Sequence, residues 1–94
     1  MPEKIKRSEE FRENLSKILL YIAKDSKNRA NNFKNSLKKE LNDLIFMPFK
    51  YRQSIYFSQS NIRDFILKGY CIPYVIDENK KEIVLLDIIK WEKR

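Results

Sequence analysis

The sequence predicts an α+β domain in which a helical hairpin packs on one face of a small, mainly antiparallel sheet. Apolar residues recur at helical spacing through the first half of the chain, and β-branched and aromatic residues form three short runs in the second half. Short polar clusters separate these segments. With 94 residues and 43% hydrophobic content, the chain is expected to form one domain, residues 1–94, around a single core.

A short strand and a helix are expected first. Residues 3–7 place Ile5 among charges, a pattern compatible with a short edge strand, and the family resemblance described below supports that strand. Ser8 is a credible N-cap, because Glu9 and Glu10 then lie in the first turn, at the positive end of the helix dipole. This helix should run to about residue 24. Its buried stripe is predicted to consist of Phe11, Leu15, Ile18, Leu19 and Ile22.

A second helix should fold back on the first. The polar residues 25–28 interrupt the pattern, and either Ser26 or Asn28 can cap the helix that follows. So short a connection implies a hairpin. Met47-Pro48 should end the second helix, because proline disfavours helical geometry in the residue before it. The predicted buried stripe is Ala30, Phe33, Leu37, Leu41 and Leu44.

Three strands are expected after a connecting segment, residues 49–60, in which aromatics and cations alternate. The strands are Ile62–Leu67, 70–76 and 82–89. In the middle strand, period-2 alternation puts Tyr70, Ile72, Tyr74 and Ile76 on one face and Cys71, Pro73 and Val75 on the other. Pro73 lacks the backbone donor that a central strand uses, so an irregularity is expected there.

The charge balance favours an acidic or polyanionic partner. Lys and Arg outnumber Asp and Glu by 20 to 13, a net charge of +7. Residues 24–52 hold eight of these cations against three acids, so the hairpin and Lys50-Tyr51-Arg52 are candidates for docking such a partner, with aromatics able to stack on bases. Individually, Lys34, Lys38 and Lys39 are best interpreted as a solvated helix face.

Cysteine usage and hydropathy bear on the compartment. A single cysteine, Cys71, cannot form an intramolecular disulfide, and no charged-then-apolar leader opens the sequence, so a reducing cytoplasm is the simplest expectation. The longest apolar run, residues 18–23, is far shorter than the roughly 20 residues that cross a bilayer. No membrane association, metal or other cofactor is expected.

The chain has no histidine, which removes the usual general acid or base near neutral pH and the usual zinc and triad chemistry. Cys71, within a strand, is interpreted as a packed residue and not as a nucleophile. RNA cleavage would then depend on cations that stabilise charge on phosphate, or on a lysine of lowered pKa. The candidates are Arg63, Lys90, Lys50, Arg52 and Lys68.

Two further features have a functional and a structural interpretation. Arg63 is either an anion-contacting residue on the exposed face of the sheet or one partner of a cross-strand ion pair with Asp87 or Glu82. Either Arg63 or its neighbour Asp64 should point outward. The basic tail with Trp91, Lys93 and Arg94 either binds a target protein or closes the end of the core.

The order of two helices and three strands, with the runs 61–77 and 82–91 and the closing Lys90-Trp91-Glu92-Lys93-Arg94, resembles the RelE/ParE superfamily of bacterial type II toxins. The resemblance implies the order β-α-α-β-β-β and a toxin held inactive by a cognate, acidic antitoxin. It also implies one of two targets, DNA gyrase or ribosome-bound mRNA. A third alternative is a binding module that keeps the fold and poisons nothing.

The resemblance also bears on the choice between these targets. Ribonuclease members such as RelE typically open the third strand with Gly-Tyr-Arg, where this chain has Gly69-Tyr70-Cys71. They tend to carry an arginine after the fourth strand and then a tyrosine, where this chain has Ile89-Lys90-Trp91 and no tyrosine after Tyr74. These departures favour a non-enzymatic, ParE-like gyrase inhibitor over a metal-independent mRNA endoribonuclease.

Overall fold

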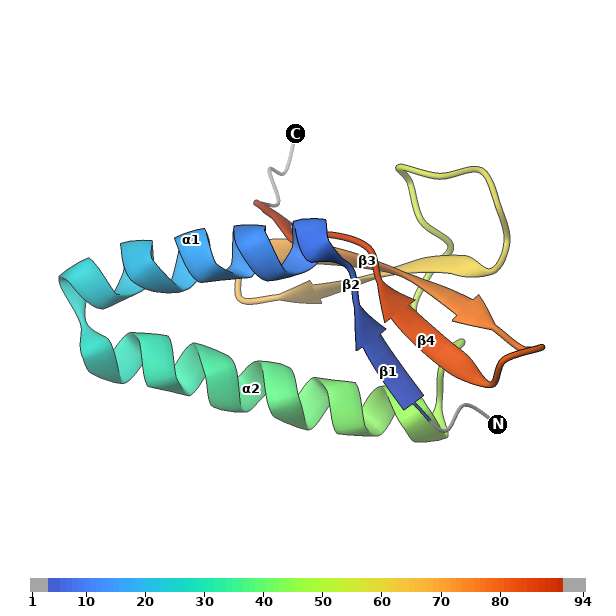
Figure 1. The fold of residues 1–94 in the computed structure, drawn as a ribbon, viewed down its shortest axis with the longest axis horizontal. Coiled ribbons are helices and arrows are strands. Elements are labelled where there is room, and N and C mark those ends of the chain that lie inside the picture. The colour runs from blue at the N-terminus through green and yellow to red at the C-terminus, as the bar shows by residue number, and fades with distance from the viewer. Residues whose placement is uncertain (1–3, 91–94) are drawn as a thin grey trace.

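The structure, a computed structural model, describes residues 4–90. Two antiparallel helices, α1 (Glu9–Asp25) and α2 (Lys27–Phe46), pack on one face of a mixed sheet (Figure 1). The strands are β1 (Lys4–Arg7), β2 (Ile62–Leu67), β3 (Tyr70–Asp77), β4 (Glu82–Leu85) and β5 (Ile89–Lys90). The sheet order is β1-β4-β3-β2, with β5 also paired to β3. The predicted α+β class is confirmed.

Capping residues set the helix boundaries. Ser8 accepts a hydrogen bond from the backbone N–H of Phe11 at 3.0 Å and donates its own hydroxyl proton to the carbonyl of Leu86 at 2.8 Å. Ser26, rather than Asn28, caps α2, since its hydroxyl accepts from the N–H of Arg29 at 3.2 Å. Ser26 also ends α1, so one residue forms the whole hairpin connection. α2 ends at Phe46, before Met47-Pro48, as predicted.

The edge strand β1 pairs with β4 in parallel, which makes the sheet mixed. Lys6 on β1 forms an ion pair with Glu82 at 3.3 Å, and Ile5 packs against the core. The strand that the sequence placed at residues 3–7 is thus present over the described residues 4–7.

The prediction of one strand over residues 82–89 is wrong, because the chain leaves the ladder after Leu85 and rejoins it at Ile89. The pairing shifts from Tyr74↔Leu85 to Cys71↔Ile89, so the three residues 86–88 lie opposite the two residues 72–73, and the one extra residue makes a β-bulge. The N–H of Leu86 donates to the Pro73 carbonyl at 2.9 Å, so Pro73 turns its donor-free nitrogen toward the same side. β3 itself runs unbroken through Pro73, where an irregularity was expected, and the break lies instead in the strand that pairs with it.

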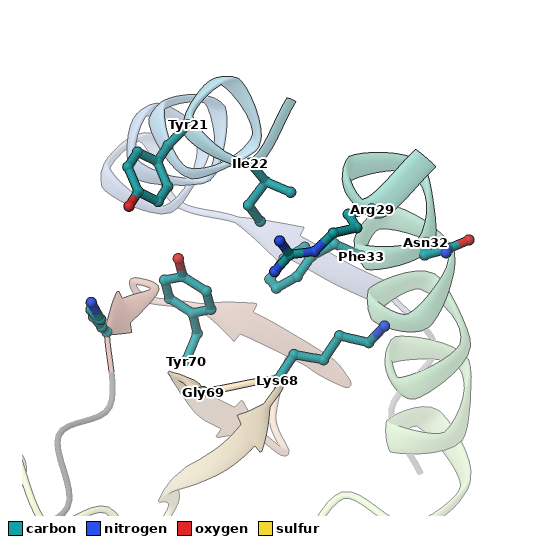
Figure 2. Close-up of a pocket in the computed structure, with 9 residues that line it drawn as sticks. Tyr21, Ile22, Arg29, Asn32, Phe33, Lys68, Gly69 and Tyr70 are labelled. Carbon is teal, nitrogen blue, oxygen red and sulfur yellow. The ribbon is translucent and has the colours of Figure 1, made fainter. Parts of the chain in front are cut away.

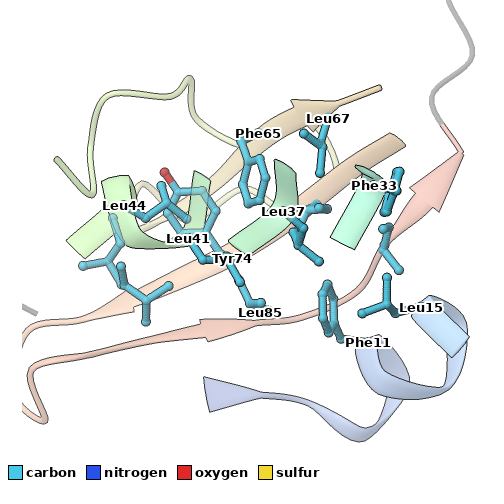
Figure 3. Close-up of a cluster of buried hydrophobic side chains, with 14 residues drawn as sticks. Phe11, Leu15, Phe33, Leu37, Leu41, Leu44, Phe65, Leu67, Tyr74 and Leu85 are labelled. Atoms are coloured by element: carbon cyan, nitrogen blue, oxygen red, sulfur yellow. The ribbon is translucent and has the colours of Figure 1, made fainter. Parts of the chain in front are cut away.

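The core lies between the helices and the sheet (Figure 3). Both predicted helix stripes point into it, and the four residues assigned to the inner face of β3 either belong to it or pack against it. Tyr74 crosses the core and donates its hydroxyl proton to the carbonyl of Pro48 at 2.6 Å. This bond ties the central strand to the start of the connecting segment.

Candidate functional site

The five candidate cations lie in two separate places. Lys68 and Lys90 line one cavity, at the end of the sheet that faces the tip of the helical hairpin. Arg63, at the other end of β2, is about 16 Å along the strand from Lys68. Lys50 and Arg52 lie on the connecting segment near Arg63, which pairs with Gln53. The chain does not assemble one cluster from all five.

The first place, here called the tip cavity, has a volume of about 340 Å³ (Figure 2). Its aromatic wall contains the half-buried Tyr70, whose ring packs edge-on against Phe33 with centroids 5.5 Å apart. Tyr21, which is 73% exposed, overhangs it from α1. The remaining lining residues are Ile22, Arg29, Asn32, Lys68, Gly69 and Lys90.

Lys68 enters the tip cavity from a strained turn. Lys68 (φ 48°) and Gly69 (φ 87°) form the two-residue link between β2 and β3, and both have positive φ. Such a turn favours asparagine or aspartate at its first position, since a lysine there gains no compensating local hydrogen bond. The turn holds the lysine at the cavity mouth at some cost in backbone energy.

Arg63 lies on the helix side of the sheet, so its placement on the exposed face was wrong. Alternation along β2 puts it with Phe65 and Leu67, which are core residues. Its guanidinium donates to the carbonyls of Tyr51 and Ser60, each at 3.1 Å, and stacks 5.1 Å from the Phe49 ring centroid. Arg63 therefore holds the connecting segment against the sheet through these two carbonyl contacts. They take the place of the alternative ion pair with Asp87 or Glu82.

Asp64 points to the other face of the sheet but is also buried, at 1% exposure. Its Oδ2 accepts from the N–H of Ile55 at 3.0 Å and lies 3.9 Å from the Arg52 guanidinium, while Oδ1 has no hydrogen-bond partner among residues 4–90. Cys71, on the same face, is a fully buried free thiol. Burial, and then the charge of Asp64, raises the pKa of Cys71 to about 12, which keeps it a neutral, packed thiol as predicted.

Lys50 and Tyr51 form the outer part of the connecting segment. The Lys50 ammonium lies 5.0 Å from the Tyr51 ring centroid, and the Tyr51 hydroxyl donates to Glu40 at 2.6 Å. Burial and the bond to Glu40 raise the pKa of Tyr51 well above its ordinary value. Tyr51 is therefore protonated at neutral pH and serves to hold the segment against α2.

A second hollow, here called the helix groove, has a volume of about 780 Å³. Leucines from both helices form its floor, and cations rim it, with no carboxylate among its lining residues. The lining residues are Arg7, Arg12, Leu15, Ser16, Leu19, Lys34, Leu37 and Lys38. Lys34, Lys38 and Lys39 are all exposed, as both a solvated helix face and a docking surface require.

Sequence reasoning missed several residues that the fold brings together. Tyr21 and Arg29, which line the tip cavity, were not predicted as site residues. Tyr21 could have been found, because an aromatic residue outside the predicted buried stripe of a helix is a candidate for binding. Either Arg63 or Asp64 was expected to point outward, but Asp64 is buried and Arg63 is half-buried. Trp91, Lys93 and Arg94 lie outside the described residues, so their roles stay predictions.

Comparison with known proteins identifies the family. Residues 5–93 match the family model described as the ParE toxin of the type II toxin-antitoxin system parDE. The chain belongs to the ParE toxin family. No curated protein sequence matches it.

The fold of this ParE-family chain is shared by solved toxin structures. One is the chromosomal ParDE system from P. aeruginosa, with a TM-score of 0.72, 16% identity, and coverage of 95% of this chain and 96% of that one. Another is the isolated E. coli RelE toxin, with a TM-score of 0.68, 15% identity, and coverage of 96% and 85%. A third is the intact E. coli RelBE toxin-antitoxin complex, with a TM-score of 0.63, 16% identity, and coverage of 95% and 96%.

The family match makes the chain a RelE/ParE superfamily toxin, and the shared fold does not choose between the two targets. One of these solved structures, the E. coli RelBE complex, contains a toxin together with its antitoxin. Within residues 4–90, no helix has the length and apolarity needed to span a membrane.

Proposed function

We propose that this protein is a type II toxin that acts in the cytoplasm without cutting RNA, and that its target is DNA gyrase. The observation that supports this is the face of the sheet turned away from the helices. Cys71 stands there where the ribonucleases that the chain resembles typically carry an arginine, and Asp64 lies beside it. Both are buried.

Phosphoryl chemistry on RNA needs positive groups aimed at the charge that develops on phosphate. At this position the chain instead has a neutral thiol and a carboxylate with one unpartnered oxygen. A carboxylate this close would repel phosphate. Arg52 favours the ribonuclease alternative, because it reaches Asp64 from an exposed position.

The experiment is tight induction of the protein with pulse labelling by thymidine and methionine over the first minutes. Early loss of thymidine incorporation alone is the expected result. Purified protein should then inhibit supercoiling by DNA gyrase, and Arg52→Ala should leave that inhibition intact.

Each other outcome contradicts the proposal in its own way. Early loss of methionine incorporation, with mRNA cleavage that Arg52→Ala abolishes, would establish the ribosome-dependent endoribonuclease. Normal incorporation of both labels would indicate a binding module that has kept the fold and lost toxicity.

We further propose that the antitoxin docks an acidic, amphipathic segment in the helix groove. A leucine floor accepts the apolar side of such a segment, and the rim formed by Arg7, Arg12, Lys34 and Lys38 accepts its carboxylates. Among residues 4–90, no acidic side chain lines the groove, so its charge favours an acidic segment and disfavours a basic one.

Charge reversal tests this docking. Lys34→Glu combined with Lys38→Glu should weaken binding of the antitoxin encoded beside this gene by at least ten-fold, measured by calorimetry at low and at physiological salt. Lys39→Glu is the matched control, because Lys39 is also exposed on α2 but does not line the groove. If Lys38→Glu and Lys39→Glu weaken antitoxin binding equally, the antitoxin does not dock in the helix groove.

A further inference from the structure

We propose that the tip cavity binds single-stranded nucleic acid, with backbone phosphates contacted by Lys68, Arg29 and Lys90 and a base stacked on the tyrosines. This site goes beyond the proposed inhibition of gyrase and does not depend on it. It rests on the lining of the cavity, on the conformation of Lys68 and on an adjoining hollow.

The cavity concentrates positive charge. Arg29, Lys68 and Lys90 come from three separate elements and line the same volume of about 340 Å³, and none of its lining residues among 4–90 is a carboxylate. Arg29 does have an acidic partner, Asp25, at 2.7 Å, but both side chains are largely exposed. A solvent-exposed ion pair of this kind contributes little, so Arg29 can turn to a stronger anion.

The cavity also offers aromatic surface next to that charge. Tyr70 rises from the sheet into the space below α1, and Tyr21 stands above it (Figure 2). Tyr70 is fixed by its edge-on contact with Phe33, so its ring orientation is set before any ligand arrives. Cations beside aromatic faces suit a nucleotide, which presents both a phosphate and a flat base. An acidic peptide would use only the cations.

The shape suits a chain more than a lone ion. A neighbouring hollow of about 700 Å³ shares Tyr21, Tyr70 and Lys90 with the tip cavity, so the two adjoin along these side chains. It adds Lys17 as a further cation. Its one acid, Asp87, accepts hydrogen bonds from Asn14 at 2.7 Å and from the N–H of Ile88 at 2.8 Å.

A substitution at Lys68 can distinguish a loss of ligand binding from a loss of protein stability. At φ 48°, asparagine fits the turn better than lysine does, so Lys68→Asn should preserve or raise thermal stability while it removes a phosphate contact. Lys81 provides a matched control, because it also has positive φ (54°) in the next hairpin and does not line the cavity. Tyr21 and Tyr56 form a second matched pair of exposed tyrosines, of which only Tyr21 lines the cavity.

The test measures fluorescence anisotropy of fluorescein-labelled oligouridylate and oligothymidylate of eight nucleotides across a salt series. Lys68→Asn should weaken binding and lower the slope of log K against log salt by about 0.7. Tyr21→Ala should weaken binding by about five-fold or more. Lys81→Asn and Tyr56→Ala should bind as the parent does. Equal losses for RNA and DNA would indicate that the 2′-hydroxyl is not read.

Three results would overturn the proposal. The first is no binding of either oligonucleotide at low salt. The second is an equal loss in the control variants, which would reduce the effect to net charge. The third is displacement of the oligonucleotide by a glutamate octapeptide whose own binding depends equally on Lys68 and Tyr21, which would assign the cavity to an acidic peptide.

Discussion

Removal of the Tyr74 hydroxyl should destabilise the protein by an amount that the structure allows to be worked out. Tyr74 is fully buried, and its hydroxyl donates to the Pro48 carbonyl at 2.6 Å. Its ring lies 5.9 Å from that of Phe65, a contact that phenylalanine would keep. Tyr74→Phe therefore deletes one hydrogen bond and leaves the packing in place.

The expected loss is about 1–1.5 kcal/mol. A net hydrogen bond contributes about 1 kcal/mol, and the penalty for a carbonyl left without a partner is larger only where water cannot reach it. Pro48 is half-buried, so water can replace the phenol in part. In a domain of this size, about 1 kcal/mol lowers the melting temperature by about 4–8 °C.

Thermal unfolding followed by circular dichroism measures this difference. Tyr21→Phe is the control, because Tyr21 is 73% exposed and should shift the free energy of unfolding by less than about 0.5 kcal/mol. If the two variants melt at the same temperature, the bond to Pro48 does not contribute and the connecting segment is held by other contacts.

Three further predictions concern the core, the cap and pH. Leu44→Ala should cost about 2–5 kcal/mol in urea unfolding, because Leu44 is 0% exposed. Ser8→Ala should cost about 1–2 kcal/mol in the same assay, since it removes the cap bond to Phe11 and the bond to Leu86; a loss no larger than that of the exposed Ser16→Ala would contradict this. Burial raises the pKa of Cys71 from 9.0 to about 12, so the folded state disfavours the thiolate; the resulting stability is complete below pH 9 and should fall as the pH rises from 9 toward 12. Cys71→Ala should make that fall shallower in urea titrations at pH 7, 9 and 11.

Local patterns in the sequence predicted most of the secondary structure. The two helix stripes, the Ser8 cap and the end at Met47-Pro48 depend on residues close together in the chain, and all were predicted. The faces of β3 followed from period-2 alternation in the same way. The break between β4 and β5 was not predicted, because it depends on how Pro73 meets a strand that is distant in sequence.

The candidate site was less predictable for the same reason. The sequence identified Lys68 and Lys90 as cations of interest but not that Arg29 and Tyr21 would share a cavity with them. It also identified Arg63 without showing that the guanidinium would be taken up by the Tyr51 and Ser60 carbonyls.

The sequence by itself determined the two helices and their buried faces, the strands β2 and β3, and the basic, histidine-free chemistry of this ParE-family chain. Only the tertiary structure decided which charges stay available. In the fold, Asp64 is buried beside Cys71, and the Arg63 guanidinium donates hydrogen bonds to backbone carbonyls. Lys68 lies exposed at the mouth of the tip cavity. The physical reason is that periodicity fixes which side of an element a residue occupies, whereas its solvation and partners depend on segments that meet only when the chain folds.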